Sequence, residues 1–130
     1  MDNGKDKLSI TWLTKGKLPS LPFLELKEKI LGKKYELSIA FVTPKISKDL
    51  NRRYRNKNKS TNILSFSIDK NIGELVIDIE AVKKDAPKFN KNYARFLGHL
   101  VIHGMLHLKG FEHSSKMDSI EEKHCLKFGF

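Results

Sequence analysis

The stretch from Tyr93 to His113 constrains the fold more than any other part of the chain, because it predicts an apolar helix that carries histidines. Apolar residues occupy almost every side of the helix expected at residues 93–108, so the helix should be buried in the middle of a domain. His103 and His107 are four residues apart and therefore share one face, about one turn apart. Gly110 favours the left-handed conformation that ends a helix and reverses the chain, which can bring His113 back to the other two histidines.

Three neutral imidazoles that meet at one point make a zinc site of the catalytic type, with a fourth position left for water. A histidine on a buried helix needs a partner, because an unpaired polar group in apolar surroundings costs free energy. The alternative is a set of core histidines bonded to backbone groups. The spacing and the glycine favour a metal. We therefore predict that His103, His107 and His113 bind one zinc ion per chain.

Composition narrows the class of protein and its compartment. The 130 residues are enough for one domain, residues 1–130, with its own core. The only cysteine, Cys125, excludes an internal disulfide and fits a reducing compartment, so we expect the cytoplasm. The N-terminus has no signal-peptide pattern, and no apolar run approaches the ~18 residues of a membrane span, so we expect no membrane partner. The net charge of +10 favours polyanionic partners such as nucleic acid, although lysine-rich surfaces also occur without them.

Patterns along the chain predict a small α+β domain with one mixed sheet of about four strands and about five helices, arranged around the buried histidine helix. Strands are expected at residues 8–12, 35–42, 63–66 and 74–79, and helices at 19–31, 46–53, 81–86, 93–108 and from 115 onward. Helix caps are expected at Ser20, at Asn90 or Asn92, and at Ser115, which forms a capping box with Asp118. The patterns leave the strand order open.

Residues 45–59 form the densest positive block, with seven basic residues and one acidic residue, Asp49. Its second half, from Asn56 to Asn62, is polar and predicts a loop. A run of charges is most often a solvated face. Here the block directly precedes a strand that should border the histidines, which favours contact with a nucleic-acid backbone.

The spacing His-x-x-x-His-x-x-Gly-x-x-His is also that of the metzincin metalloproteases, in which a glutamate follows the first histidine as general base. Here that position is Gly104, which cannot accept a proton. Peptide hydrolysis by that route is therefore disabled, and the pattern favours metal-assisted hydrolysis of another substrate.

Three sequence blocks resemble the YbeY family of bacterial metal-dependent endoribonucleases, which act in ribosomal RNA maturation. The blocks run from His99 to His113, from Leu50 to Phe66 (Leu-Asn-Arg-Arg-Tyr-Arg, then Ser-Thr-Asn-Ile-Leu-Ser-Phe) and from Ile72 to Ile77 (Ile-Gly-Glu-Leu-Val-Ile). They lie in the family's order and cover about residues 50–113. Glu74 and Glu112 stand where the family has aspartate, and Ser60 stands where it has proline; each replacement keeps charge or turn character.

The resemblance implies roles for particular residues. It matches His103, His107 and His113 to the zinc ligands, Arg55 to a functional arginine of the active site, and His99 to a residue that supports the ligands. Arg55 and the histidines would form the catalytic group, with Arg55 contacting phosphate oxygens. The residues expected to bind RNA are Arg52, Arg53, Arg55, Lys57 and Lys59.

The function implied is a single-strand-specific, zinc-dependent endoribonuclease that matures the 3′ end of small-subunit ribosomal RNA and acts in ribosome quality control. Its partners would be ribosomal RNA and the ribosome or small-subunit proteins. Two alternatives stay open. One is a non-catalytic zinc protein that binds RNA during ribosome assembly, with Cys125 or His124 completing a structural site. The other is a metal-dependent hydrolase of another substrate.

Overall fold

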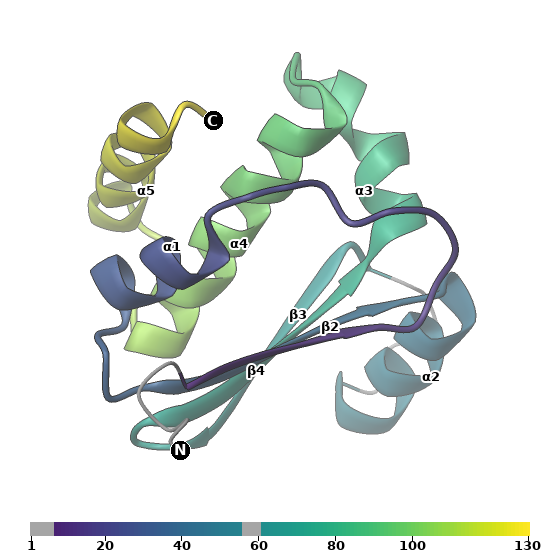
Figure 1. Ribbon diagram of the computed structural model, residues 1–130, viewed down its shortest axis with the longest axis horizontal. Coiled ribbons are helices and arrows are strands. Elements are labelled where there is room, and N and C mark those ends of the chain that lie inside the picture. The colour runs from purple at the N-terminus through teal and green to yellow at the C-terminus, as the bar shows by residue number, and fades with distance from the viewer. Residues whose placement is uncertain (1–6, 56–60) are drawn as a thin grey trace.

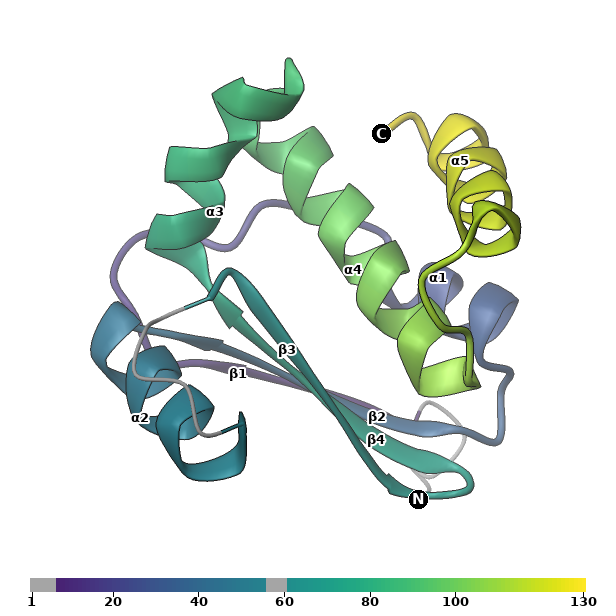
Figure 2. The same ribbon diagram turned by 180° about the vertical axis from the view of Figure 1, so that it is seen from behind.

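One four-stranded sheet with helices on both of its faces makes up the fold, as shown by a computed structural model that describes residues 7–55, without the side chain of Arg55, and residues 61–130 (Figures 1 and 2). The strands are β1 (Leu8–Trp12), β2 (Glu36–Val42), β3 (Ile63–Asp69) and β4 (Ile72–Asp78). The helices are α1 (Phe23–Ile30), α2 (Pro44–Arg55), α3 (Ile79–Asp85), the short 3₁₀ helix η2 (Ala86–Phe89), α4 (Tyr93–Lys109) and α5 (Ser115–Phe128). The predicted α+β class and mixed sheet are confirmed.

The strand order is β1-β2-β4-β3, which the sequence patterns left open. β1 pairs with β2, and β2 with β4, in parallel, so that Ile39 lies between Ile10 and Leu75. β3 and β4 form an antiparallel hairpin in which Ser65 pairs with Leu75. This order puts β3 at one edge of the sheet, where it borders α4.

The histidine helix α4 lies at the centre of the larger of two cores. α1, α3, α4 and α5 cover one face of the sheet and α2 covers the other, as both ribbon views show (Figures 1 and 2). Ten of the seventeen α4 residues are buried, as the apolar pattern predicts. A smaller core on the opposite face joins Val42, Leu64 and Val76 to Ile46 and Leu50 of α2.

The ends of α4 are fixed by two of the predicted signals. The side-chain oxygen of Asn92 accepts a hydrogen bond from the backbone N–H of Arg95 at 2.9 Å, so Asn92 and not Asn90 is the cap. Gly110 has φ +111° and ends the helix in the left-handed conformation. The chain then reverses, and the backbone N–H of Phe111 bonds to the carbonyl of Leu106.

Several predicted boundaries are wrong by a few residues. α1 begins at Phe23 instead of residue 19, and Pro22, not Ser20, occupies its cap position. The cap of α5 is Ser114, whose hydroxyl accepts a hydrogen bond from the backbone N–H of Met117; the predicted cap, Ser115, is already helical. In each case a neighbouring residue takes the non-helical conformation that a cap requires.

The strand predicted at residues 74–79 runs from Ile72 to Asp78 instead. It ends there because the Asp78 side chain accepts a hydrogen bond from the backbone N–H of Ala81 and caps α3. Pro87 lies in the first turn of η2, where its missing N–H costs nothing.

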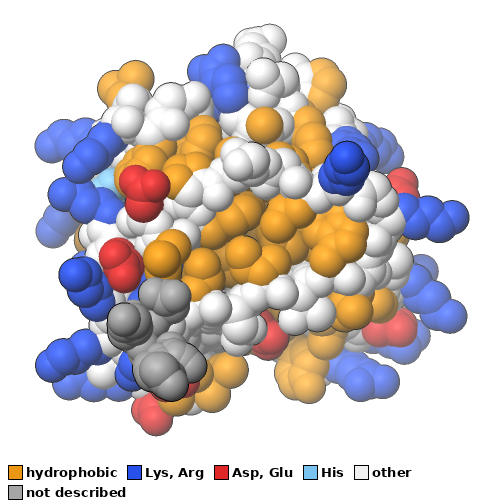
Figure 3. Space-filling view, in the orientation of Figure 1, with side chains coloured by type: hydrophobic (Ala, Val, Ile, Leu, Met, Phe, Trp, Pro, Cys, Tyr) orange, Lys and Arg blue, Asp and Glu red, His pale blue; other side chains and the backbone are white. Residues whose placement is uncertain are grey.

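The surface seen from the β1 side is apolar in the middle and basic around the rim (Figure 3). Ile10 of β1 and Leu13 after it are among the exposed hydrophobic residues. No helix within the two described ranges is long and apolar enough to cross a bilayer.

Candidate metal centre

The three predicted ligands lie together at the C-terminal end of α4. His103 and His107 stand on one face of α4, and His113 returns to them after the turn at Gly110. One ligand atom from each histidine lies within 4.8 Å of the others. The ring centroids of His113 are 5.2 Å from those of His103 and 4.6 Å from those of His107. His113 is exposed and the other two are half-buried, so the centre opens to solvent.

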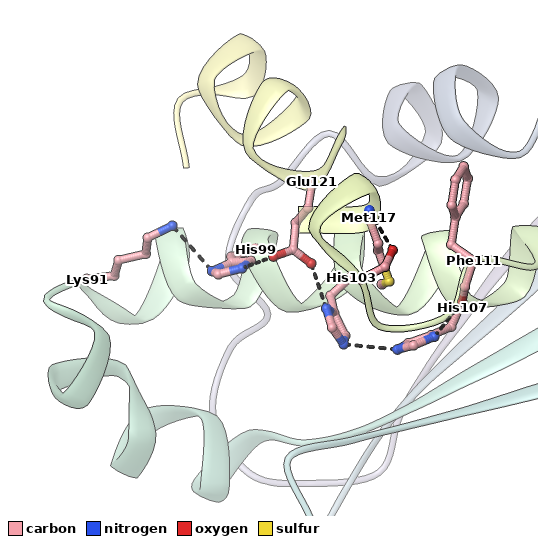
Figure 4. A network of polar contacts seen from close by, with 8 residues as sticks. Lys91, His99, His103, His107, Phe111, Met117 and Glu121 are labelled. Carbon is pink, nitrogen blue, oxygen red and sulfur yellow. Dashed lines mark hydrogen bonds and ion pairs between the residues drawn. The ribbon is translucent and has the colours of Figure 1, made fainter. Parts of the chain in front are cut away.

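Hydrogen bonds at Nδ1 fix how the two helical histidines point. Nδ1 of His107 lies 3.0 Å from the carbonyl oxygen of Phe111, to which it can only donate. In a neutral imidazole the other nitrogen, Nε2, is then an acceptor. Nε2 of His107 faces Nε2 of His103 at 3.1 Å (Figure 4). The turn after Gly110 therefore both delivers His113 and sets the tautomer of His107.

The orientation of His103 depends on Glu121 of α5. Nδ1 of His103 lies 2.6 Å from Oε1 of Glu121. Burial raises the pKa of the Glu121 carboxyl, but the hydrogen bonds from His103 and His99 outweigh it and lower the pKa to about 2. A carboxylate only accepts hydrogen bonds, so Nδ1 of His103 is the donor, and in the neutral ring Nε2 is then an acceptor.

The other oxygen of Glu121 holds His99, the residue that we predicted to support the ligands. Nε2 of His99 lies 2.7 Å from Oε2 of Glu121, and Nδ1 lies 3.3 Å from Nζ of Lys91. The lysine donates to Nδ1 and Nε2 donates to the carboxylate, so one neutral tautomer of His99 satisfies both contacts. Figure 4 shows the resulting row of contacts from Lys91 through His99 and Glu121 to His103 and His107.

A zinc ion fits this donor set. Two nitrogen ligands of a tetrahedral zinc ion, each about 2.0–2.1 Å from the metal, are roughly 3.3 Å apart. The two facing Nε2 atoms are 3.1 Å apart, close to that spacing, and in the neutral tautomers that Glu121 and Phe111 favour both present lone pairs to the same point. Hydrogen bonds from the far nitrogens of ligating histidines to a carboxylate and a carbonyl are the usual support of such a site. His103, His107 and His113 would hold the metal.

Glu121 was missed by the sequence patterns. It lies eight residues beyond His113, in a helix with an ordinary mixture of charges. A weak signal was present, because Glu121 is four residues after Met117 and so shares the face of α5 that carries a buried apolar residue. A carboxylate on a buried face needs a partner, and the histidines of α4 were the available ones.

The two residues considered as a fourth ligand are not in the group that the structure brings together. α5 does fold back onto α4 (Figure 2). His124, however, lies near Lys29, Lys109 and Lys127; burial and these charges lower its pKa. Cys125 is buried and burial raises the pKa of its thiol. Among the described residues, the candidate metal-binding group consists of His103, His107 and His113, and it includes neither His124 nor Cys125.

The predicted RNA-binding residues lie on the other face of the sheet or outside the described residues. Arg52 and Arg53 are exposed on α2, and Arg52 forms an ion pair with Asp49 at 3.3 Å. Arg55 is the last residue of α2, and its side chain is outside the description. Lys57 and Lys59 lie outside the described residues. Their roles stay predictions.

Gly104 does not face the metal centre. A Cβ atom at this position would lie 2.7 Å from Cδ2 of Leu75 and 2.9 Å from Cδ1 of Ile63, on the sheet side of α4. The glycine therefore allows the helix to approach the sheet closely. A glutamate here could not serve as the protease base, because its side chain would start among buried sheet residues.

A pocket of about 410 Å³ adjoins the histidines. Its walls come from the beginning of β3, from η2, from α4 and from α5. His99, His103, His107, His113 and Glu121 line one end of it. Its volume lies within the range of about 300–1,000 Å³ that small-ligand sites occupy.

The fold and the site thus define a small α+β protein in which three histidines are grouped at metal-binding distance beside a pocket. The family model described as Endoribonuclease YbeY matches residues 9–127, which is nearly the whole chain. The chain belongs to the YbeY family of endoribonucleases.

Curated relatives and a solved structure agree with this assignment. A protein named Endoribonuclease YbeY from Colwellia psychrerythraea is 44% identical over 94 residues, which span 67% of this chain and 61% of the relative. One from Buchnera aphidicola is 39% identical over 114 residues, 76% of this chain and 72% of the relative. The solution structure of TM1509 from Thermotoga maritima matches with a TM-score of 0.65 and 27% identity, covering 89% of this chain and 86% of that one. The aligned part is less than two thirds of the Colwellia protein's length.

Proposed function

We propose that this chain is a zinc-dependent endoribonuclease that cuts single-stranded RNA, and that its substrate is ribosomal RNA at the 3′ end of the small-subunit RNA. The observation that carries the proposal is the pair of facing Nε2 atoms of His103 and His107, which line a pocket, in a chain of an endoribonuclease family. Action in ribosome quality control, with the ribosome or small-subunit proteins as partners, belongs to the same proposal.

A zinc ion in this centre would supply a Lewis acid and an activated water at neutral pH. The chain's own residues supply the rest. Glu121 and the carbonyl of Phe111 hold His103 and His107 in the tautomers that leave Nε2 free. The exposed His113 leaves the centre accessible from solvent, which a polymeric substrate requires.

The positive charge needed to hold RNA comes from the α2 region in this proposal. Arg55 would contact phosphate oxygens with a planar, permanently charged group, and Arg52, Arg53, Lys57 and Lys59 would contact the RNA backbone. Supporting this, Thr61, at the end of the segment that follows α2, lines the pocket. Ser47 of α2 holds Thr61 in place through a hydrogen bond of 3.0 Å to its carbonyl oxygen. The cytoplasm is the proposed compartment, since ribosomal RNA is processed there and the chain has one unpaired cysteine.

The test compares wild type, Arg55→Ala and Arg95→Ala for metal content and for cleavage of a single-stranded RNA. Arg95 is an exposed arginine near the start of α4 and is the matched control. We expect equal zinc in all three proteins, and cleavage lost only in Arg55→Ala. Equal cleavage by Arg55→Ala would remove that residue from the mechanism. Cleavage that survives in a His107→Ala protein without metal would show a contaminating ribonuclease and overturn the proposal.

A further inference from the structure

The pocket beside the metal centre extends well beyond the histidines. It continues along α4 past Leu100 and Phe96 to Phe89 at the end of η2, and its other wall is the start of β3. The metal centre itself occupies only one end. The remaining length is available to a group of the substrate next to the bond that reacts.

Phe89 is an exposed aromatic ring in a fixed position. Its side chain is 54% exposed, yet its ring stacks on that of Phe96 with centroids 4.8 Å apart and an interplanar angle of 19°. Phe96 is 1% exposed and belongs to the main core. The backbone after Phe89 is held by bonds from the N–H groups of Asn90 and Lys91 to carbonyls of η2. An anchored ring with an exposed side is suited to stacking.

The wall on the β3 side is mostly polar. Thr61, Asn62 and Ser65 line it, together with the apolar Ile63. Asn62 is held by a hydrogen bond of 3.2 Å from its amide to Asp85, the residue before η2. The pocket therefore combines a flat apolar surface on one side with short polar side chains on the other. That combination matches a nucleobase, which has an aromatic face and a hydrogen-bonding edge.

We propose that this pocket binds one unpaired nucleobase of the RNA next to the bond that is cut, with the base stacked on Phe89. The inference rests on the proposed function. It gives a structural reason for preference for single strands, because a base within a duplex cannot leave its stack without a cost in free energy. Lys91, which contacts His99 at 3.3 Å, adds a positive charge near the pocket.

The test is a double-mutant cycle between Phe89 and single bases of the substrate. Cleavage by the metal-loaded protein is measured on a single-stranded RNA and on a series in which one nucleotide at a time is abasic. Phe89→Trp keeps a stacking surface. Ile68→Ala is the matched control, since Ile68 is a 63% exposed apolar side chain of β3 that does not line the pocket.

We expect Phe89→Ala to lower kcat/KM on intact RNA by roughly 5- to 150-fold, the range for loss of one base–aromatic stack. When the nucleotide that stacks on Phe89 is abasic, the kcat/KM of wild type should fall by a similar factor. The kcat/KM of Phe89→Ala should be the same on that abasic RNA as on intact RNA. Phe89→Trp keeps a stacking surface and should recover most of the cleavage that Phe89→Ala loses, whereas Ile68→Ala should cleave intact RNA as wild type does.

Two results overturn the inference while the proposed function stands. One is a kcat/KM of Phe89→Ala equal to that of wild type. The other is a decrease in kcat/KM for Phe89→Ala whose effect on the free energy of activation adds to that of the missing base at every abasic position. A wild-type protein that holds zinc and cuts no RNA overturns the proposed function, and the inference with it. A general loss of structure in Phe89→Ala would also lower kcat/KM by the same factor on every RNA. The thermal unfolding temperature of Phe89→Ala, compared with that of wild type, shows whether this has happened.

Discussion

Oε1 of Glu121 lies 2.6 Å from Nδ1 of His103, although the two residues belong to different helices and are eighteen positions apart. The same carboxylate reaches His99 with its other oxygen. α5 therefore takes part in the candidate metal centre through Glu121. This carboxylate sets the orientation of His103 and of His99, which lies one turn before it.

Glu121→Gln should weaken zinc binding and leave the fold intact. The substitution keeps the shape but removes the charge and one of the two acceptors, so one imidazole loses its partner. Loss of such support for a ligating histidine typically lowers metal affinity about 10- to 100-fold. A zinc titration against a competing chelator measures the effect. Glu122→Gln, the same change at the exposed neighbouring residue, should bind zinc as wild type does; an equal loss in both variants would contradict the role of Glu121.

His107→Ala should lose more zinc affinity than Glu121→Gln, because it removes a donor atom of the centre. Cleavage should fall to background. The side chain is only partly buried, so the fold should survive, and circular dichroism can check this. His124→Ala removes a half-buried histidine of α5 and should change neither property. Full zinc content in His107→Ala would show that the metal is held elsewhere.

Gly104→Ala and Gly104→Glu should differ in stability. Alanine gains about 1 kcal/mol of helix propensity, but its Cβ would force the ends of Leu75 and Ile63 aside, which typically costs about 1–3 kcal/mol. Glutamate would also bury a charge without a partner, so we expect a further loss of about 3 kcal/mol or more in the free energy of unfolding. Urea unfolding measures both, and a Gly104→Glu protein as stable as Gly104→Ala would mean that the side chain escapes to solvent.

Removing Arg52 and Arg53 together should make RNA binding less sensitive to salt. Each cation that neutralises a phosphate of single-stranded RNA contributes about 0.7 to the slope of log affinity against log salt. The double alanine variant should therefore lose about 1.4 from the slope. Lys33→Ala with Lys34→Ala removes the same charge from the turn before β2, at the other end of that strand from α2 (Figure 1). An equal loss in both variants would mean that only the overall charge matters.

Local patterns predicted the elements and the grouping of His103, His107 and His113, because each depends on residues close together in the chain. The alternation in β2, the apolar pattern of α4 and the turn at Gly110 are of this kind. The strand order and Glu121 could not be predicted in the same way. The pairing of β2 with β4 and the reach of Glu121 to His103 depend on how distant segments pack. The predicted cap of α5 was wrong by one residue, Ser115 instead of Ser114, because adjacent serines offer the same local signal.

The turn at Gly110 also has a consequence for the unfolded chain. All three predicted ligands lie within the eleven residues from His103 to His113, a segment short enough for one turn to join them, so even an unfolded chain can gather imidazoles around an ion at a small entropic cost of loop closure. An ion stabilises a fold only through the difference between its affinities for the folded and unfolded chains. Zinc should therefore raise the unfolding temperature less than its affinity for the native protein suggests. The size of that shortfall measures how tightly the segment alone binds the ion.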